Sequence, residues 1–349
     1  MRFSWIYSVI ISFIVTAGAL APAAKASAND TDLLSQAKEN FEPLPTKPEF
    51  KKDNPGTEEK IKLGLTLYFD TRLSSSNVFS CSSCHDLALG GTDNSDFSIG
   101  HNWKKGGRNA PTVFNAALHI AQFWDGRAHD VEEQAGMPVT NPVEMNSSKE
   151  LVIERLRSIP GYVSMFDKAF PGEKPSLTYE NMAKAIGAFE RTLITPSRFD
   201  DFLRGDTKAL TKEEKDGLKL FMDTGCIICH NGTTVGGMTY QKFGLIKKPE
   251  FVKDKGRFEV TKDKKDMHVF KVPSLRNIEL TYPYFNGGEV WDLYKAVKIM
   301  GESQLGVELD DKQTMSIVTF LKALTGEKPP ITLPSIPPAS VSTPRPDTN

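Results

Sequence analysis

Two copies of the pattern C-x-x-C-H constrain this 349-residue chain more than any other feature. One copy runs from Cys81 to His85 and the other from Cys226 to His230, and together they use all four cysteines. In this pattern both thiols add across the vinyl groups of a haem, and the adjacent histidine is placed to ligate the iron. A zinc site, a redox-active C-x-x-C or two disulfides would also use cysteines, but none of them requires a histidine directly after the second cysteine. The motifs therefore predict two covalently bound haem c groups, with attachment at Cys81, Cys84, Cys226 and Cys229 and proximal ligands His85 and His230.

An internal repeat predicts that each haem has its own copy of one domain. Residues 62–71 align with 215–224 and are identical at six of ten positions, and each segment precedes a C-x-x-C-H motif. A later pair of segments, 111–126 and 273–288, shares Pro, Asn, Leu, Phe and Gly at a constant offset of 162 residues. A duplicated haem domain explains both similarities.

Apolar residues at helical spacing predict an all-α protein. Together with the two haem-attachment motifs and the repeat, they predict two tandem c-type cytochrome domains with long loops and one covalent haem each. Ser147 and Glu150 form a potential capping box for a helix that continues to Ile159. Long glycine-rich stretches separate the helices, and a haem can serve as the core of such loops. The other predicted helices cover residues 58–69, 211–222, 290–300 and 312–324.

The same reading divides the chain into four parts. Residues 1–28 are the predicted signal peptide, 29–195 the N-terminal cytochrome domain and 196–326 the C-terminal one. The junction is predicted at Thr195-Pro196-Ser197. Residues 327–349 contain seven prolines and are predicted to be an extended tail.

The N-terminus has the composition of an export signal. Arg2 precedes an apolar run over residues 5–19, and Ala26-Ser27-Ala28 offers a small-x-small cleavage site. A membrane anchor would need about 20 apolar residues, so the run is short for a span, and no later segment is long enough either. The formal net charge of −1 gives no electrostatic reason to expect binding to nucleic acid. We therefore expect an exported protein without a stable membrane span after cleavage.

Several stretches besides the two motifs resemble one known family. They are FDTRLSSS (69–76), GHNWKKGGRNAPTVFNA (100–116), AQFWDGRA (121–128), NPVEM (141–145), MDTGCIICHNG (222–232), PYFNGG (283–288) and VKIMG (297–301). Along nearly the whole mature length the chain resembles the bacterial dihaem cytochrome c peroxidases. The resemblance implies two c-type cytochrome folds that face each other, in a periplasmic homodimer. It also implies reduction of hydrogen peroxide to water, with electrons from a small cytochrome c or cupredoxin.

The resemblance assigns different roles to the two haems. A His/Met ligand pair raises the haem potential and suits electron transfer, whereas an open or displaceable sixth position admits a substrate. By this resemblance His230 and Met300 ligate the high-potential C-terminal haem, which accepts electrons. His85 is then the proximal ligand of the peroxidatic N-terminal haem, and His101 its distal ligand in the resting oxidised state.

The resemblance also implies residues beyond the haem ligands. Glu144 and Gln134 match the distal-pocket pair, in which a carboxylate moves a proton between the two peroxide oxygens and the amide orients the peroxide. Trp124 would lie between the haems as an electron conduit. An inter-haem calcium site, of the oxygen-ligand type that suits this hard cation, would use Asn109, Thr281 and Pro283.

Three other functions compete with the peroxidase. A dihaem electron carrier without peroxidase activity would keep both irons six-coordinate and have no use for Glu144. A MauG-like oxidase, which modifies a partner protein, would carry tyrosine in place of Met300. A haem-based sensor would be expected to carry a signalling domain, and none is recognisable. Peroxide turnover with a reduced small cytochrome separates these functions.

Overall fold

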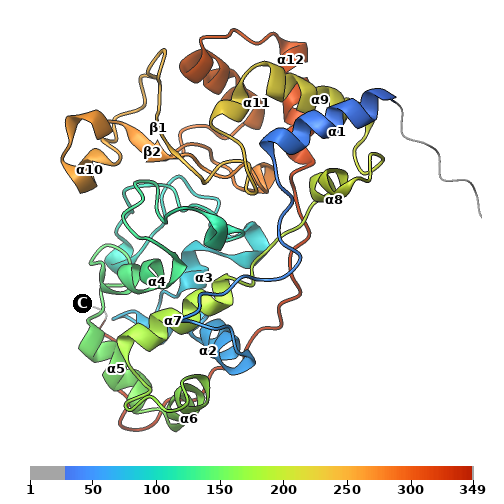
Figure 1. Cartoon of the computed structure of the whole chain (residues 1–349). Helices are drawn as coiled ribbons and strands as arrows, with labels where there is room; N and C mark the ends of the chain where they lie inside the picture. The colour runs from blue at the N-terminus through green and yellow to red at the C-terminus, as the bar shows by residue number, and fades with distance from the viewer. Residues whose placement is uncertain (1–27, 348–349) are drawn as a thin grey trace, which may run out of the picture.

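A computed structural model of the chain describes residues 28–347. Most of its regular structure is helical, and long irregular segments join the helices (Figure 1). The predicted signal peptide, residues 1–28, lies almost wholly outside the described part. Within residues 28–347, no helix is both long and apolar enough to span a bilayer.

Helices occur from the start of the described chain to residue 322, and two short strands flank a short helix in its C-terminal half. In sequence they are α1 (Ala28–Asn40), α2 (Glu58–Tyr68), α3 (Cys81–Cys84), α4 (Val131–Thr140), α5 (Lys149–Arg157), α6 (Pro160–Ala169), α7 (Tyr179–Glu190), α8 (Arg198–Arg204), α9 (Lys212–Asp223), β1 (Tyr240–Lys242), α10 (Phe258–Thr261), β2 (Val269–Lys271), α11 (Leu293–Met300) and α12 (Asp311–Lys322). Short 3-10 turns lie between them, and a π-helical turn, Gly301–Leu305, follows α11.

Helices α2 and α9 confirm the predicted helices at 58–69 and 211–222 to within a residue or two. Each begins after a threonine whose side chain accepts a backbone N–H of the first turn, Thr57 before α2 and Thr211 before α9. The capping box predicted at Ser147 is wrong. Ser148 caps α5 instead, because its side chain accepts the Leu151 N–H at 3.1 Å.

The prediction of an all-α protein holds for most of the chain but missed one small sheet. Strands β1 and β2 pair antiparallel, with Tyr240 opposite Lys271 and Lys242 opposite Val269. Each strand has only three residues, which is too short to produce a readable alternation of apolar and polar side chains.

Two large apolar clusters and a small third one form the core, and each large cluster contains one close helix pair. In the first cluster α2 packs on α7, and a Cβ at Gly64 would lie only 1.9 Å from the Ala185 carbonyl oxygen. In the second, α9 packs on α12, and a Cβ at Gly217 would lie 2.1 Å from the Ser316 carbonyl oxygen. Glycine is required at both crossings because the helix backbones touch. The two glycines are equivalent in the repeat.

The later repeat is also reproduced in the backbone. Asn115 and Asn277 both have positive φ, 60° and 61°, and each precedes a 3-10 turn. Both asparagine side chains donate to the same hydroxyl, Thr195 Oγ1, each at 2.8 Å. Phe123 and Phe285 likewise share positive φ, 66° and 72°. Thr195 therefore joins equivalent positions of the two repeats at the segment where the sequence predicts a junction.

Both ends of the described chain cross from one cluster to the other (Figure 1). Helix α1 packs in the second cluster, where Phe41 meets Phe199 edge to face at 5.3 Å, although the sequence placed residues 29–195 in one domain. After α12 the predicted extended tail has no helix up to residue 347 and runs back along the first cluster. There Ile331 packs against the core, and Pro337 covers Gly161.

Candidate haem sites and the interface between them

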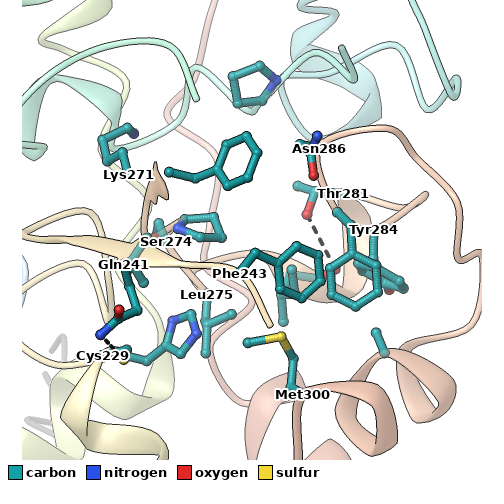
Figure 2. A pocket seen from close by; sticks show the side chains of 18 of the residues that line it. Cys229, Gln241, Phe243, Lys271, Ser274, Leu275, Thr281, Tyr284, Asn286 and Met300 are labelled. Atoms are coloured by element: carbon teal, nitrogen blue, oxygen red, sulfur yellow. Dashed lines mark hydrogen bonds between the residues drawn. The ribbon is translucent and has the colours of Figure 1, made fainter. Parts of the chain in front are cut away.

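The C-terminal motif borders a cavity of about 230 Å³. Cys226, Cys229 and His230 line one part of it, and Met300, the last residue of α11, also lines it (Figure 2). The π-helical turn begins directly after Met300, and π-helical turns are frequent at functional sites. The structure therefore brings together the four C-terminal residues that the sequence assigns to one haem.

The two motif histidines have equivalent surroundings. Burial lowers the pKa of His230 to about 4, although nearby backbone groups, Pro273 among them, raise it. Burial also lowers the pKa of His85, whose Nδ1 lies 3.4 Å from Gly91 O, and the Pro111 carbonyl acts on the same ring. Pro111 and Pro273 are equivalent in the repeat. Both rings are thus neutral. Nδ1 of His85 faces the Gly91 carbonyl, whereas Nδ1 of His230 is buried without a hydrogen-bond partner among the described residues.

The four cysteines differ from disulfide and redox-active cysteines. None of them is in a disulfide. Burial raises the pKa of every one of these thiols, that of Cys84 to about 11. Redox-active C-x-x-C motifs instead depend on a lowered thiol pKa. An apolar cavity with two thiols, a neutral imidazole and a thioether on its walls fits a covalently attached haem.

His101 lies in a tightly packed loop of the first half. Its side chain is only 1 % exposed, its Nδ1 lies 3.2 Å from Ser75 Oγ, and its N–H donates to Glu144 O at 2.7 Å. Gly100 must be glycine here, since a Cβ would lie 2.2 Å from Val143 O. The structure thus brings the predicted distal histidine and the predicted acid–base residue together through one backbone hydrogen bond.

Burial raises the pKa of Glu144, while Arg127 and the Asn141 side chain act in the opposite direction. Asn141 Nδ2 donates to Glu144 Oε1 at 2.7 Å. Gln134 lies half-buried on α4. The loop that carries Glu144 folds back on the end of this helix, through the bond from Ser147 N–H to Val139 O at 2.8 Å. The two predicted distal residues therefore come from neighbouring segments.

Ser75 is a residue of this site that sequence reasoning did not single out. Its N–H donates to Met145 O, and its carbonyl accepts from Arg155 Nη2 at 2.8 Å and from the Asp347 N–H at 2.9 Å. Arg155, which is fully buried, also donates to Arg345 O at 3.0 Å. The tail thus supports the serine that touches His101. The available signal was its place in FDTRLSSS, one of the family-like stretches.

The two repeats meet through reciprocal hydrogen bonds. The Asn109 N–H donates to Asn286 O at 2.8 Å, and the Lys271 N–H donates to Trp124 O at 2.8 Å. Asn109 and Lys271 are equivalent at the offset of 162, and so are Trp124 and Asn286. Trp124 Nε1 also donates to Asn109 O at 2.9 Å. Trp124 therefore lies at the interface between the two halves, on the wall of the C-terminal cavity.

The three predicted calcium ligands all lie on the wall of one cavity. Asn109, Thr281 and Pro283 all line the C-terminal cavity, and Figure 2 shows Thr281 close to Asn286. A buried ion-pair cluster lies nearby, in which Arg108 contacts Asp125 and makes a bidentate pair with Asp254 at 2.6 and 2.9 Å.

Three histidines have no motif, and the sequence left them without a functional role. His129 is exposed, and His268 Nδ1 lies 2.7 Å from Asp254 O. His119 differs, because it lines the C-terminal cavity.

These features define a protein built to hold two c-type haems. The family model described as di-haem cytochrome c peroxidase matches residues 58–208. The cytochrome c551 peroxidase of Pseudomonas aeruginosa is 48% identical over 344 residues, which are 97% of this chain and 96% of that protein. The cytochrome c551 peroxidase of Nitrosomonas europaea is 48% identical over 83% of this chain and 87% of its own. The chain belongs to the dihaem cytochrome c peroxidase family.

The fold is also similar to solved structures. A MauG-like protein associated with microbial copper homeostasis is 30% identical, with a TM-score of 0.73 over 81% of this chain and 95% of its own. The diheme peroxidase BthA from Burkholderia thailandensis is 18% identical and has a TM-score of 0.64 over 78% of this chain and 87% of its own, a likeness of fold alone.

Proposed function

We propose that this protein is a periplasmic cytochrome c peroxidase, which reduces hydrogen peroxide to water with electrons from a small cytochrome c or cupredoxin. The observation that carries the proposal is the buried carboxyl group of Glu144, whose backbone holds His101. A plain electron carrier has no need of a proton-transferring group beside its haem ligand. The peroxidase names of relatives 48% identical over most of the chain support the same activity.

The proposed organisation is two tandem cytochrome domains, residues 29–195 and 196–326, with one covalent haem each, in which α1 packs against the C-terminal domain. Bound haem would supply the redox chemistry of peroxide reduction. His230 and Met300 would hold the C-terminal haem for electron acceptance, and His85 and His101 would hold the N-terminal one. We further propose that the protein acts as a homodimer.

Proton transfer is the chemical contribution of this chain's own residues at the N-terminal site. Glu144 would take a proton from the near oxygen of peroxide and return it to the leaving oxygen, a role that suits a carboxyl group whose pKa burial has raised. Gln134 would orient the peroxide.

At the interface, Trp124 would conduct electrons between the haems, which its hydrogen bonds to both halves support. Calcium bound by Asn109, Thr281 and Pro283 would fix the same interface, and their common place on the cavity wall supports this.

The test is a turnover assay with hydrogen peroxide and a reduced small cytochrome c, on protein matured by a host that attaches c-type haem. We expect two haems per chain in a pyridine haemochrome assay and continuous oxidation of the donor. Two haems without peroxide-dependent oxidation of any small donor would favour the electron carrier. Oxidation of a partner protein instead would favour the MauG-like alternative.

Met300→His is expected to lower the potential of the C-terminal haem, because nitrogen ligation stabilises ferric iron more than a thioether does. A spectroelectrochemical titration measures this, and the N-terminal potential should stay constant. Met315→His is the control, since Met315 is 50% exposed on α12. Unchanged potentials in Met300→His would mean that another residue ligates the iron.

His101→Gly is expected to open the N-terminal haem in the fully oxidised protein. The variant should bind cyanide and show the corresponding spectral change without prior reduction, because the distal imidazole is gone. His129→Gly changes an exposed histidine and serves as the control. If oxidised His101→Gly kept the low-spin spectrum of the wild type, His101 would not be the distal ligand.

A further inference from the structure

A buried lysine and a buried histidine form a pair on the wall of the C-terminal cavity. Lys271, the last residue of β2, is 6% exposed, and its Nζ lies 3.0 Å from His119 Nδ1. Both residues line the cavity that Cys226, Cys229 and His230 also line. In Figure 2, Lys271 lies on the side of Gln241 and Cys229, away from Met300.

This pair presents only hydrogen-bond donors to its surroundings. Burial, and secondarily the charge of Lys271, lower the pKa of His119 well below its usual range, so the ring is neutral. Its Nδ1 accepts from the ammonium group, and the ring proton therefore lies on Nε2. Among the described residues Nε2 is buried without a partner, and Nδ1 uses one of the three ammonium protons.

The cavity offers these donors no acid. No aspartate, glutamate or arginine lies among the described residues that line it, and Lys271 is the only side chain there with an ordinary positive charge. Burial lowers the pKa of Lys271 to about 8, and no carboxylate counteracts this effect. A buried cation without a counter-ion is costly, so the site favours an anion.

The repeat relates this pair to the calcium site proposed above. At the offset of 162, Lys271 corresponds to Asn109, and His119 corresponds to Thr281. Asn109 and Thr281 are two of the proposed calcium ligands. Asn109 and Thr281 thus offer oxygen atoms that suit a bound cation. At the equivalent place, Lys271 carries a positive charge of its own.

We propose that Lys271 and His119 together bind a propionate carboxylate of the C-terminal haem, and that the charge of Lys271 helps to set the potential of that haem. The inference rests on the proposed function, because it requires a haem on Cys226 and Cys229. The attached haem is the source of carboxylate that the cavity lacks. A free inorganic anion at the same donors is the alternative outcome.

Redox titration of the holoprotein tests the charge of Lys271. Lys271→Met keeps the length of the side chain and removes the ammonium group. The positive charge of this group favours the reduced haem, so its loss should favour the oxidised haem. At a fixed potential we expect the ratio of reduced to oxidised C-terminal haem to fall about tenfold, which is about 59 mV for one electron. The N-terminal haem should not change. Lys271→Arg should restore the wild-type value, and Lys242→Met, on the exposed end of β1, is the control.

Haem content distinguishes failure of the proposed function from failure of the propionate-binding inference. A wild-type protein without a C-terminal haem would overturn the proposed function itself. A Lys271→Met protein with two haems and an unchanged C-terminal potential would overturn only the present inference. If this variant fails to retain the haem, a crystal structure of the wild-type holoprotein decides. Either propionate within about 3.2 Å of Lys271 Nζ supports the proposal. Both propionates out of reach, or a free anion on these donors, refutes it.

Discussion

Replacing Glu144 with glutamine is expected to lower peroxide turnover by at least about a hundredfold, while both haems are retained. The reason is that departure of the leaving oxygen needs a proton, and a positioned proton carrier contributes about 10²–10⁴-fold. Glutamine keeps the shape of the side chain and its contact with Asn141, but it cannot exchange a proton. Steady-state turnover with a reduced small cytochrome measures the loss, and reduction of the C-terminal haem should proceed at the wild-type rate.

The pH dependence of turnover gives a second readout for Glu144. Its carboxylate form is the base, and this form is lost as the pH falls through a pKa that burial has raised. The wild type should therefore lose activity on acidification at a higher pH than an ordinary glutamate would cause, and the residual activity of Glu144→Gln should lack this loss. Glu150→Gln, at an exposed site, is the control. Wild-type turnover in Glu144→Gln would move the proton transfer to another group.

Asp200→Asn is expected to destabilise the second cluster by about 3–5 kcal/mol, because it leaves the buried guanidinium of Arg276 without its counter-ion. Both side chains are 0% exposed, and Arg276 Nη1 donates to Asp200 Oδ2 at 2.6 Å. Asp200 also accepts from the Leu44 N–H at 2.7 Å, which attaches the segment after α1 to this cluster. Denaturant unfolding of the holoprotein, followed by circular dichroism, measures the effect.

The matched control removes an exposed ion pair whose N···O distance equals that of the buried pair. Lys212 and Asp216 lie 2.6 Å apart, with side chains 81% and 60% exposed, so solvent screens their interaction. Lys212→Met should therefore leave the unfolding midpoint almost unchanged. An Asp200→Asn protein as stable as this control would mean that the buried pair contributes no net stability.

Local sequence signals predicted most of what is local in this structure. The helices around Gly64 and Gly217 were predictable because their apolar spacing and threonine caps lie within a dozen residues. The cap at Ser148 was missed by one residue, because only Ser147 has a glutamate three residues later, whereas Ser148 caps the helix through its own hydroxyl without a reciprocal side chain. Strands β1 and β2 are too short to produce a pattern at all.

Features that depend on distant contacts were not predictable in the same way. The place of α1 depends on the contact of Phe41 with Phe199, far along the chain. The support of His101 depends on Ser75, which the tail contacts from the far end of the sequence. Lys271 and His119 belong to no motif, although the offset of 162 contained a signal, since it relates both residues to proposed calcium ligands.

The reciprocal bonds between the repeats have a consequence for the history of the protein. Asn109 binds Asn286, which is equivalent to Trp124. Lys271, which is equivalent to Asn109, binds Trp124. Contacts of this form are the signature of a two-fold symmetric dimer, in which one surface recognises a copy of itself. A single-haem ancestor that paired through this surface would have acquired the present architecture when gene duplication joined its two subunits. The joined copies were then free to diverge, as Lys271 and Asn109 have at one pair of equivalent positions.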